Sequence, residues 1–162
     1  MTEIRKAVHS GGCQCGAVRY ALYAEPTNPH ICHCRMCQKA FGGFFAPLAK
    51  VQNRDLHWTR GAPTTFLSSP IVERGFCAAC GTPLTFRFLE EDKIDISIGS
   101  LDDPAAVQPR TQVGVEARLG WFAELHALPE SETEANMPAE LLARIVSHQH
   151  PDHDTEVWPA SG

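Results

Sequence analysis

Hydrophobic and polar positions alternate over short stretches along the first 130 residues, and Gly and Pro separate these stretches. Such alternation is typical of β-strands with a buried face, because successive side chains of a strand point to opposite sides. The expected strands are residues 4–9, 17–23, 44–51, 64–68, 72–76, 84–89, 94–98 and 112–117. The chain is therefore predicted to be mainly β.

Two of these stretches make more specific predictions. Pro47 interrupts residues 44–51, and a residue without an N–H group indicates an edge strand or a bulge. Residues 94–98 alternate isoleucine with Asp95 and Ser97, which predicts one buried face and one solvent-exposed face.

The sequence becomes more polar toward its C-terminus. Residues 138–147 predict a helix, because Pro138 suits a first helical turn and apolar residues follow at helical spacing. Residues 149–162 are expected to be loosely ordered. We therefore expect one domain over residues 1–129 and a C-terminal extension over residues 130–162.

Composition narrows the classes of function. The chain has 162 residues, 43% hydrophobic and 20% charged, which suits one domain with an ordinary core. The net charge of -5 argues against nucleic acid as a partner, since phosphate binding needs a basic surface. No apolar run approaches the ~20 residues of a membrane span. The N-terminus lacks an apolar signal region, so a cytoplasmic location is expected.

Seven cysteines fall into three groups, and an odd number excludes a complete set of intramolecular disulfides. A cytoplasmic setting keeps thiols reduced, so the groups point to metal binding. The groups are Cys13 and Cys15; Cys32, Cys34 and Cys37; Cys77 and Cys80.

Zinc prefers four tetrahedral ligands when its role is structural, and three protein ligands when it is catalytic. Seven thiolates divide most simply as four plus three, with the two pairs closing one site and the triplet leaving one position open. The spacing also allows Cys77 and Cys80 to join two members of the triplet. A plainer interpretation is that the cysteines are buried packing residues, or that they form one structural site with spares.

Several residues near the triplet are candidates for substrate contact. Arg35 and Lys39 are predicted to hold a substrate carboxylate, and Arg74 is a similar candidate; the alternative is an ordinary solvated charge. His33 lies between Cys32 and Cys34 and should point away from their metal. The nearby Phe41, Phe44 and Phe45 form either an apolar lid or part of the core.

The cysteine motifs resemble those of the glutathione-dependent formaldehyde-activating enzyme family, which includes centromere protein V. The matching segments are GGCQCGAVRY at residues 11–20, CHCRMCQK at residues 32–39 and FCAACGTPL at residues 76–84. The resemblance implies a β-tent zinc fold of short antiparallel strands, to which this chain adds its C-terminal helix. One departure is Val113-Gly114, where a His-Ile type pair is expected.

The same resemblance implies two zinc ions per chain. The structural ion would be held by Cys13, Cys15, Cys77 and Cys80, and the catalytic ion by Cys32, Cys34 and Cys37. The implied activity is that of a carbon–sulfur lyase, with a small thiol such as glutathione and a small aldehyde such as formaldehyde as partners. A homodimer is compatible with the sequence. The competing hypothesis is a non-catalytic zinc module that binds a protein or a ligand.

Overall fold

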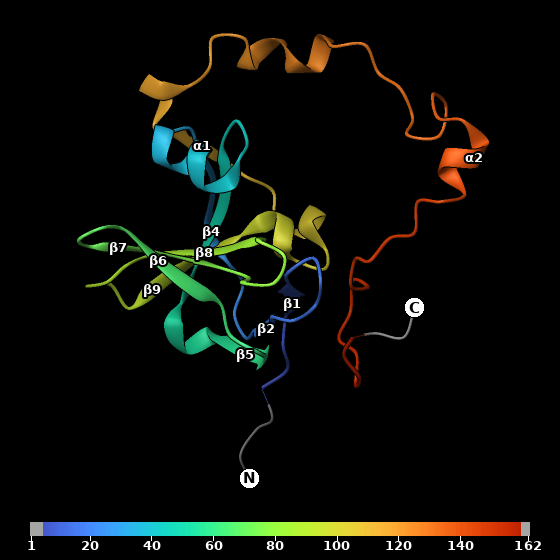
Figure 1. Ribbon diagram of the computed structural model, residues 1–162. Helices are drawn as coiled ribbons and strands as arrows, with labels where there is room; N and C mark the ends of the chain where they lie inside the picture. Colours follow the sequence, from blue (N-terminus) through green and yellow to red (C-terminus); the bar gives the residue numbers. More distant parts are fainter. Residues whose placement is uncertain (1–4, 160–162) are drawn as a thin grey trace.

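The computed structural model describes residues 5–159 and contains two β-sheets (Figure 1). The smaller sheet has the order β1-β2-β5, formed by β1 (His9–Gly12), β2 (Arg19–Leu22) and β5 (Leu56–Arg60). The larger sheet has the order β10-β3-β4-β9-β8-β7-β6. Its strands are β3 (Thr27–Cys32), β4 (Ala46–Gln52), β6 (Thr64–Ser69), β7 (Val72–Phe76), β8 (Pro83–Phe88), β9 (Lys93–Ser97) and β10 (Thr111–Val113). The mainly β prediction is confirmed; the strands pair antiparallel except β10, which runs parallel to β3.

Helical segments are short. The α-helices are α1 (Arg35–Phe41) and α2 (Ala139–Leu142), and the 3₁₀ segments are η1 (Asn53–Asp55), η2 (Ile98–Ser100), η3 (Pro104–Ala106), η4 (Val115–Ala117) and η5 (Phe122–Ala127). The helix predicted over residues 138–147 is therefore wrong in length. Its apolar residues Leu141, Ile145 and Val146 are exposed, and a short helix without a buried face gains little from tertiary packing.

The strand predictions were most accurate where alternation is clear. The stretches at 17–23, 44–51, 64–68, 72–76, 84–89 and 94–98 each overlap one strand. The stretch at 112–117 is half correct, because β10 ends at Val113 and a 3₁₀ turn follows. The stretch at 4–9 was placed too early, since β1 begins at His9; residue 4 lies outside the described residues. Strands β3 and β5 were not predicted.

Two finer predictions were wrong, because β4 is a central strand and β9 is buried on both faces. The register shift between β3 and β4 falls at residues 27–30 of β3, so Pro47 marks no bulge either. Strand β4 lies between β3 and β9, so it is not an edge strand. Pro47 precedes Leu48, the first residue that pairs with β9. Asp95 and Ser97 were expected on an exposed face, yet each side chain belongs to a residue only 3% exposed.

The hydrophobic core contains both sheets and one group of cysteines. Tyr20 and Leu22 of β2 meet Leu84 of β8 and Ile96 of β9, and all four are fully buried. Burying one large apolar side chain stabilises a fold by about 1.5–3 kcal/mol. Cys13 and Cys77 belong to this cluster, and Cys15 and Cys80 pack against its edge. A smaller cluster gathers Cys37, Ala46 and Leu48, with Cys32 and Cys34 packed against it. Each cluster thus holds one group of cysteines.

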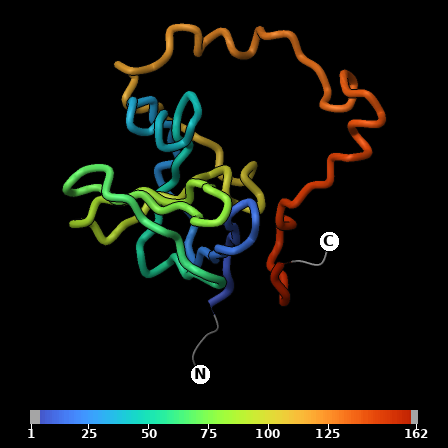
Figure 2. The backbone as a smooth tube through the Cα atoms, viewed as in Figure 1, coloured from blue at the N-terminus to red at the C-terminus, as the bar shows by residue number. Residues whose placement is uncertain are grey.

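The C-terminal segment leaves the sheets after residue 128 and returns to the small sheet, as the tube in Figure 2 shows. The backbone N–H of His150 donates to Gln14 O at 2.7 Å, and Trp158 Nε1 donates to Cys15 O at 2.7 Å. Residues 149–159 have no regular secondary structure, but they contact the loop that carries Cys13 and Cys15. Within the range that the structure covers, no helix is long and apolar enough to cross a membrane.

One buried ion pair links Arg19 of β2 to Asp102, just after η2, and a second contact links it to Asp154 of the C-terminal segment. Arg19 is 3% exposed and donates to both carboxylate oxygens of Asp102, at 2.7 and 2.6 Å. It also donates to Asp154 at 2.9 Å. Burial acts to raise the pKa of Asp102, but hydrogen bonds from Arg19 and Ser10 and the positive charge of Arg19 outweigh it, so the pKa is lowered.

We predict that Asp102→Asn lowers the free energy of unfolding by roughly 3 kcal/mol at pH 7, because it leaves a buried guanidinium without its main partner. The folded pKa lies below the unfolded value of about 3.9, so this stabilisation is present above that pH and is lost as the pH falls through the folded pKa. The difference between the two proteins should therefore shrink in acid. Urea unfolding at pH 7 and near pH 3 measures it.

Asp154→Asn is the matched control, since Asp154 contacts the same guanidinium but its side chain is 53% exposed. We expect it to lower stability by less than about 1 kcal/mol. Equal losses for the two variants would contradict a dominant role for the buried pair.

Candidate metal centres

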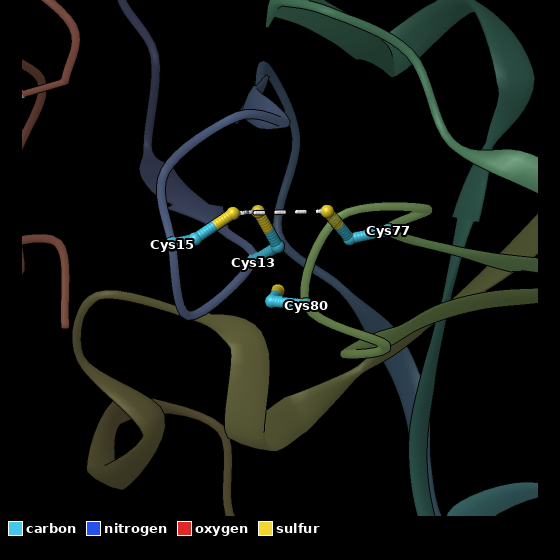
Figure 3. A group of neighbouring side chains, drawn as sticks. All are labelled: Cys13, Cys15, Cys77 and Cys80. Carbon is cyan, nitrogen blue, oxygen red and sulfur yellow. Dashed lines mark hydrogen bonds between the residues drawn. The ribbon is translucent and has the colours of Figure 1, made fainter. Parts of the chain in front are cut away.

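The first cysteine group lies between two loops (Figure 3). Cys13 and Cys15 follow β1, and Cys77 and Cys80 follow β7. The four Sγ atoms lie within 4.8 Å of one another, with 3.6 Å between Cys13 and Cys15 and 3.9 Å between Cys15 and Cys77. Sulfurs held about 2.3 Å from one zinc ion in tetrahedral geometry lie about 3.8 Å apart. The four sulfurs thus have the spacing of one closed metal site.

Thr82 connects the two loops, and the cysteine motifs did not predict its role. Its hydroxyl accepts from the backbone N–H of Gln14 at 3.0 Å and lies 3.1 Å from Cys80 Sγ. Burial acts to raise the pKa of Cys80, but hydrogen bonds from Thr82 and from Cys15 outweigh it and lower the pKa to about 6. Burial raises the pKa of Cys13, Cys15 and Cys77. A cation is therefore needed to hold all four as thiolates.

The second cysteine group comes from one short segment. Cys32 ends β3, Cys34 is the N-cap of α1, and Cys37 lies in the first turn of that helix. Their Sγ atoms also lie within 4.8 Å of one another. Cys37 is buried, whereas Cys32 and Cys34 are partly exposed. This group can therefore be reached from solvent on the side of Cys32 and Cys34.

The environments of these three thiols differ. Burial raises the pKa of Cys37 to about 12, and a hydrogen bond from Arg74 opposes this rise. Burial also acts to raise the pKa of Cys34, but the backbone N–H of Cys37, the other two thiols and the charge of Arg74 outweigh it, so the pKa is lowered. Nearby donors and a positive charge thus favour the thiolate of Cys34, whereas burial raises the pKa of Cys32 and Cys37.

His33 lies outside both sulfur groups. Its ring is fully buried, and Nε2 lies 2.9 Å from Gln112 Oε1. The ring packs edge-on against Phe45 and Phe122. It contributes to an aromatic cluster behind the site, which agrees with the expectation that it points away from the metal.

Phe41 and Phe44, each expected in either an apolar lid or the core, have different surroundings. Phe41 packs against the small core cluster, so it is a core residue. Phe44 is 47% exposed and lies on the surface, where its ring packs edge-on against Trp121 with 4.8 Å between the ring centres.

Gly114, one of the two residues that depart from the family pattern, packs against the second cysteine group. It follows β10 with a φ of 64°, and a Cβ atom there would lie 2.7 Å from the backbone nitrogen of Cys34. The preceding Val113 O accepts from the N–H of His33 at 2.9 Å. A glycine is required because the chain here packs directly against the backbone of a cysteine in the second group.

We predict that Gly114→Ala lowers stability by about 1–2 kcal/mol or more, from the left-handed backbone alone, and reduces metal binding by the second group through its displacement of Cys34. Thermal unfolding and metal analysis of the purified variant measure the two effects. Gly120→Ala is the control, because nothing lies within 4 Å of a Cβ atom there. Equal behaviour of the two variants would contradict the close approach.

The predicted substrate residues line one cavity beside α1. Arg35 and Lys39 are exposed and face a cavity of about 350 Å³, together with Met36, Phe66 and Arg74. Arg74 is not a solvated charge, because it is only 7% exposed. Contact of Arg35 and Lys39 with a substrate stays a prediction.

The sulfurs gather as four plus three, and not with Cys77 and Cys80 beside the triplet. Both sets consist of thiols alone, and thiolate ligands at tetrahedral spacing favour zinc among the common biological metals. Either group can thus hold a metal ion.

We predict that Cys34→Ser lowers the zinc content from about two ions to about one per chain, because two thiolates are a poor zinc site. The fold should remain, since the four-cysteine group is untouched. Cys80→Ser should instead lower the unfolding temperature, because the four-cysteine group joins the two sheets. Metal analysis and thermal unfolding measure these results. A Cys34→Ser protein that keeps two zinc ions would contradict the assignment.

Comparison with known proteins agrees with this arrangement. A family model described as "Glutathione-dependent formaldehyde-activating enzyme" matches residues 8–117, a range that contains all seven cysteines. The fold is similar to the crystal structure of a Rhodobacter sphaeroides protein, with a TM-score of 0.53 and 22% sequence identity. That similarity covers 64% of this chain and 99% of the other, and it concerns the fold alone.

Proposed function

This chain belongs to the glutathione-dependent formaldehyde-activating enzyme family, and we propose that it is a zinc-dependent carbon–sulfur lyase. Its substrates would be adducts of a small thiol and a small aldehyde, such as S-(hydroxymethyl)glutathione. The observation that carries the proposal is the difference between the two sulfur groups. One has four donors and lies at the edge of the main core, whereas the other has three donors, two of them partly exposed.

In this proposal Cys32, Cys34 and Cys37 hold a zinc ion through three thiolates. A zinc ion held by these three residues would supply an open fourth position and would lower the pKa of an exogenous thiol. The partly exposed side at Cys32 and Cys34 admits the thiol. Arg35 and Lys39, beside the neighbouring cavity, supply positive charge for the carboxylates of a thiol such as glutathione.

The reaction balances without a redox partner. The thiolate sulfur attacks the carbonyl carbon of formaldehyde, so a carbon–sulfur bond forms as the carbonyl π-bond breaks. The electron pair of that bond moves to oxygen, which takes a proton from solvent. The reverse reaction removes the proton from the hydroxyl group, re-forms the carbonyl and releases the thiolate.

The alternative, a non-catalytic zinc module, would be favoured by a protein side chain that completes the second group as its fourth ligand. Among residues 5–159, no histidine, aspartate or glutamate joins the three sulfurs at ligand distance. His33, the nearest histidine in sequence, packs among aromatic rings instead. This supports the enzyme over the module.

We predict that the zinc-loaded protein accelerates the exchange of glutathione and formaldehyde with S-(hydroxymethyl)glutathione. Exchange NMR at equilibrium measures the rate. Cys34→Ser should lower the enhancement by at least about 100-fold, because loss of an outer-shell partner alone lowers zinc-site function 10–100-fold.

Asp154→Asn, far along the chain from the triplet, is the control and should keep the full rate. A wild-type protein that holds its zinc but gives no more than the uncatalysed exchange rate would exclude these substrates.

A further inference from the structure

Arg74 is a buried cation that forms no ion pair with any of residues 5–159. It lies in the middle of β7, and its guanidinium stacks on the ring of Phe86, with 4.9 Å from Cζ to the ring centre. In the described part of the chain, no aspartate or glutamate lies within ion-pair distance of it. A buried charge is strongly destabilising unless a partner of opposite charge compensates it.

The hydrogen bonds of Arg74 lead to the second cysteine group. Nη2 donates to Cys37 Sγ at 3.5 Å, and Nε donates to Ser68 Oγ at 3.1 Å. Nη1 is buried and has no hydrogen-bond partner among the described residues. Among the described residues, Cys37 Sγ is therefore the one hydrogen-bond partner of this guanidinium that becomes an anion on binding a metal.

Arg19, the other buried arginine among the described residues, has carboxylate partners for its charge. Arg19 is 3% exposed and donates to the carboxylates of Asp102 and Asp154. Arg74 is also buried, at 7% exposed, but has no such partner among the described residues. The exposed cations beside it, Arg35 and Lys39, can be balanced by solvent and salt.

Formal charges explain why a cation belongs at this place. Three thiolates and one divalent zinc ion carry a net charge of -1, and one guanidinium brings the buried assembly to zero. A donor to a ligand sulfur also fixes the direction of that sulfur, and such outer partners strengthen metal sites.

We propose that Arg74 is a positioning residue of the second metal site: it holds Cys37 Sγ as a correctly oriented thiolate ligand and neutralises the three-thiolate zinc. This inference rests on the proposed function, because it requires a metal at Cys32, Cys34 and Cys37. The counter-charge of the site would then come from β7, because Arg74 is 37 residues from Cys37 along the chain.

The test measures metal affinity rather than catalysis. The three-cysteine site is titrated with zinc against a chromogenic chelator, and with cobalt(II), whose thiolate charge-transfer absorption reports coordinated sulfurs. A Cys34→Ser protein defines the signal of the four-cysteine site alone. Arg74→Met should weaken zinc at the three-cysteine site by roughly 10–100-fold and shift its cobalt spectrum, with the four-cysteine site unchanged.

Two matched sets of variants separate charge from packing. Arg74→Lys keeps the positive charge and should restore most of the affinity. Arg35→Met and Lys39→Met remove neighbouring exposed charges and should leave it within about twofold of wild type, because solvent screens them. Phe86→Leu disturbs the stacking of Arg74 without removing its charge and should have a smaller effect than Arg74→Met. If Arg74→Met does not fold, Arg74→Gln replaces it in the comparison with Arg74→Lys.

Wild-type affinity in Arg74→Met would overturn the inference, as would equal losses in Arg74→Lys and the uncharged variant when both are folded. A loss in Phe86→Leu as large as that in Arg74→Met would overturn it too, since packing would then be the cause. These results differ from a failure of the proposed function: if the wild-type protein itself binds no metal at the three cysteines, both fail, whereas intact binding that ignores Arg74 removes only this inference.

Discussion

The structure depends first on the meeting of Cys13 and Cys15 with Cys77 and Cys80. The first pair belongs to the small sheet and the second to a turn of the large sheet, so a metal at this point joins the two. Cys15 and Cys77 are 62 residues apart, and closing a loop of that length costs about 4 kcal/mol of chain entropy. A structural zinc contributes roughly 10–16 kcal/mol. The metal therefore outweighs the closure, and the core around Tyr20 and Leu84 can form across both sheets.

The second cysteine group, in contrast, comes from a single segment of the chain. Its three sulfurs come from six consecutive residues at the end of β3 and the start of α1, so bringing them together costs little chain entropy. Residues that are distant in the sequence contact this segment. Gly114 packs on the backbone of Cys34, and Arg74 reaches Cys37 from β7. Gln38 Nε2 binds the backbone oxygens of His33 and Ala117, which fixes the helix to the chain after β10. Local sequence gathers the ligands, and distant residues set their positions and their charge.

This difference explains what the sequence could predict. The two sulfur groups were visible because C-x-C and C-x-x-C spacings are local patterns, and the family resemblance joined the distant pairs. Strands such as β7 were visible because their alternation is local too. Strand β3 was not, since Asn28 has a φ of 46° and Pro29 interrupts the pattern. The contact of Trp158 with Cys15 joins residues 143 positions apart, and no periodic pattern in the sequence indicates it.

The burial of Arg74 was unpredictable for a related reason. Arg35, Lys39 and Arg74 have similar side chains, and only the fold decides which of them loses its water. Strand β7 lies between β6 and β8, where Phe66 and Phe86 flank Arg74, whereas α1 turns Arg35 and Lys39 toward solvent. Stacking on an aromatic ring attracts a cation, but it offsets only part of the hydration that a buried guanidinium loses, so a negative partner is still needed. The same burial that makes Arg74 costly in isolation makes its interaction with the cysteine sulfurs strong, because little water is present to screen it. The two groups thus differ in their surroundings: the four-donor group lies between the two sheets, and the three-donor group places two partly exposed sulfurs and one buried sulfur beside a buried guanidinium.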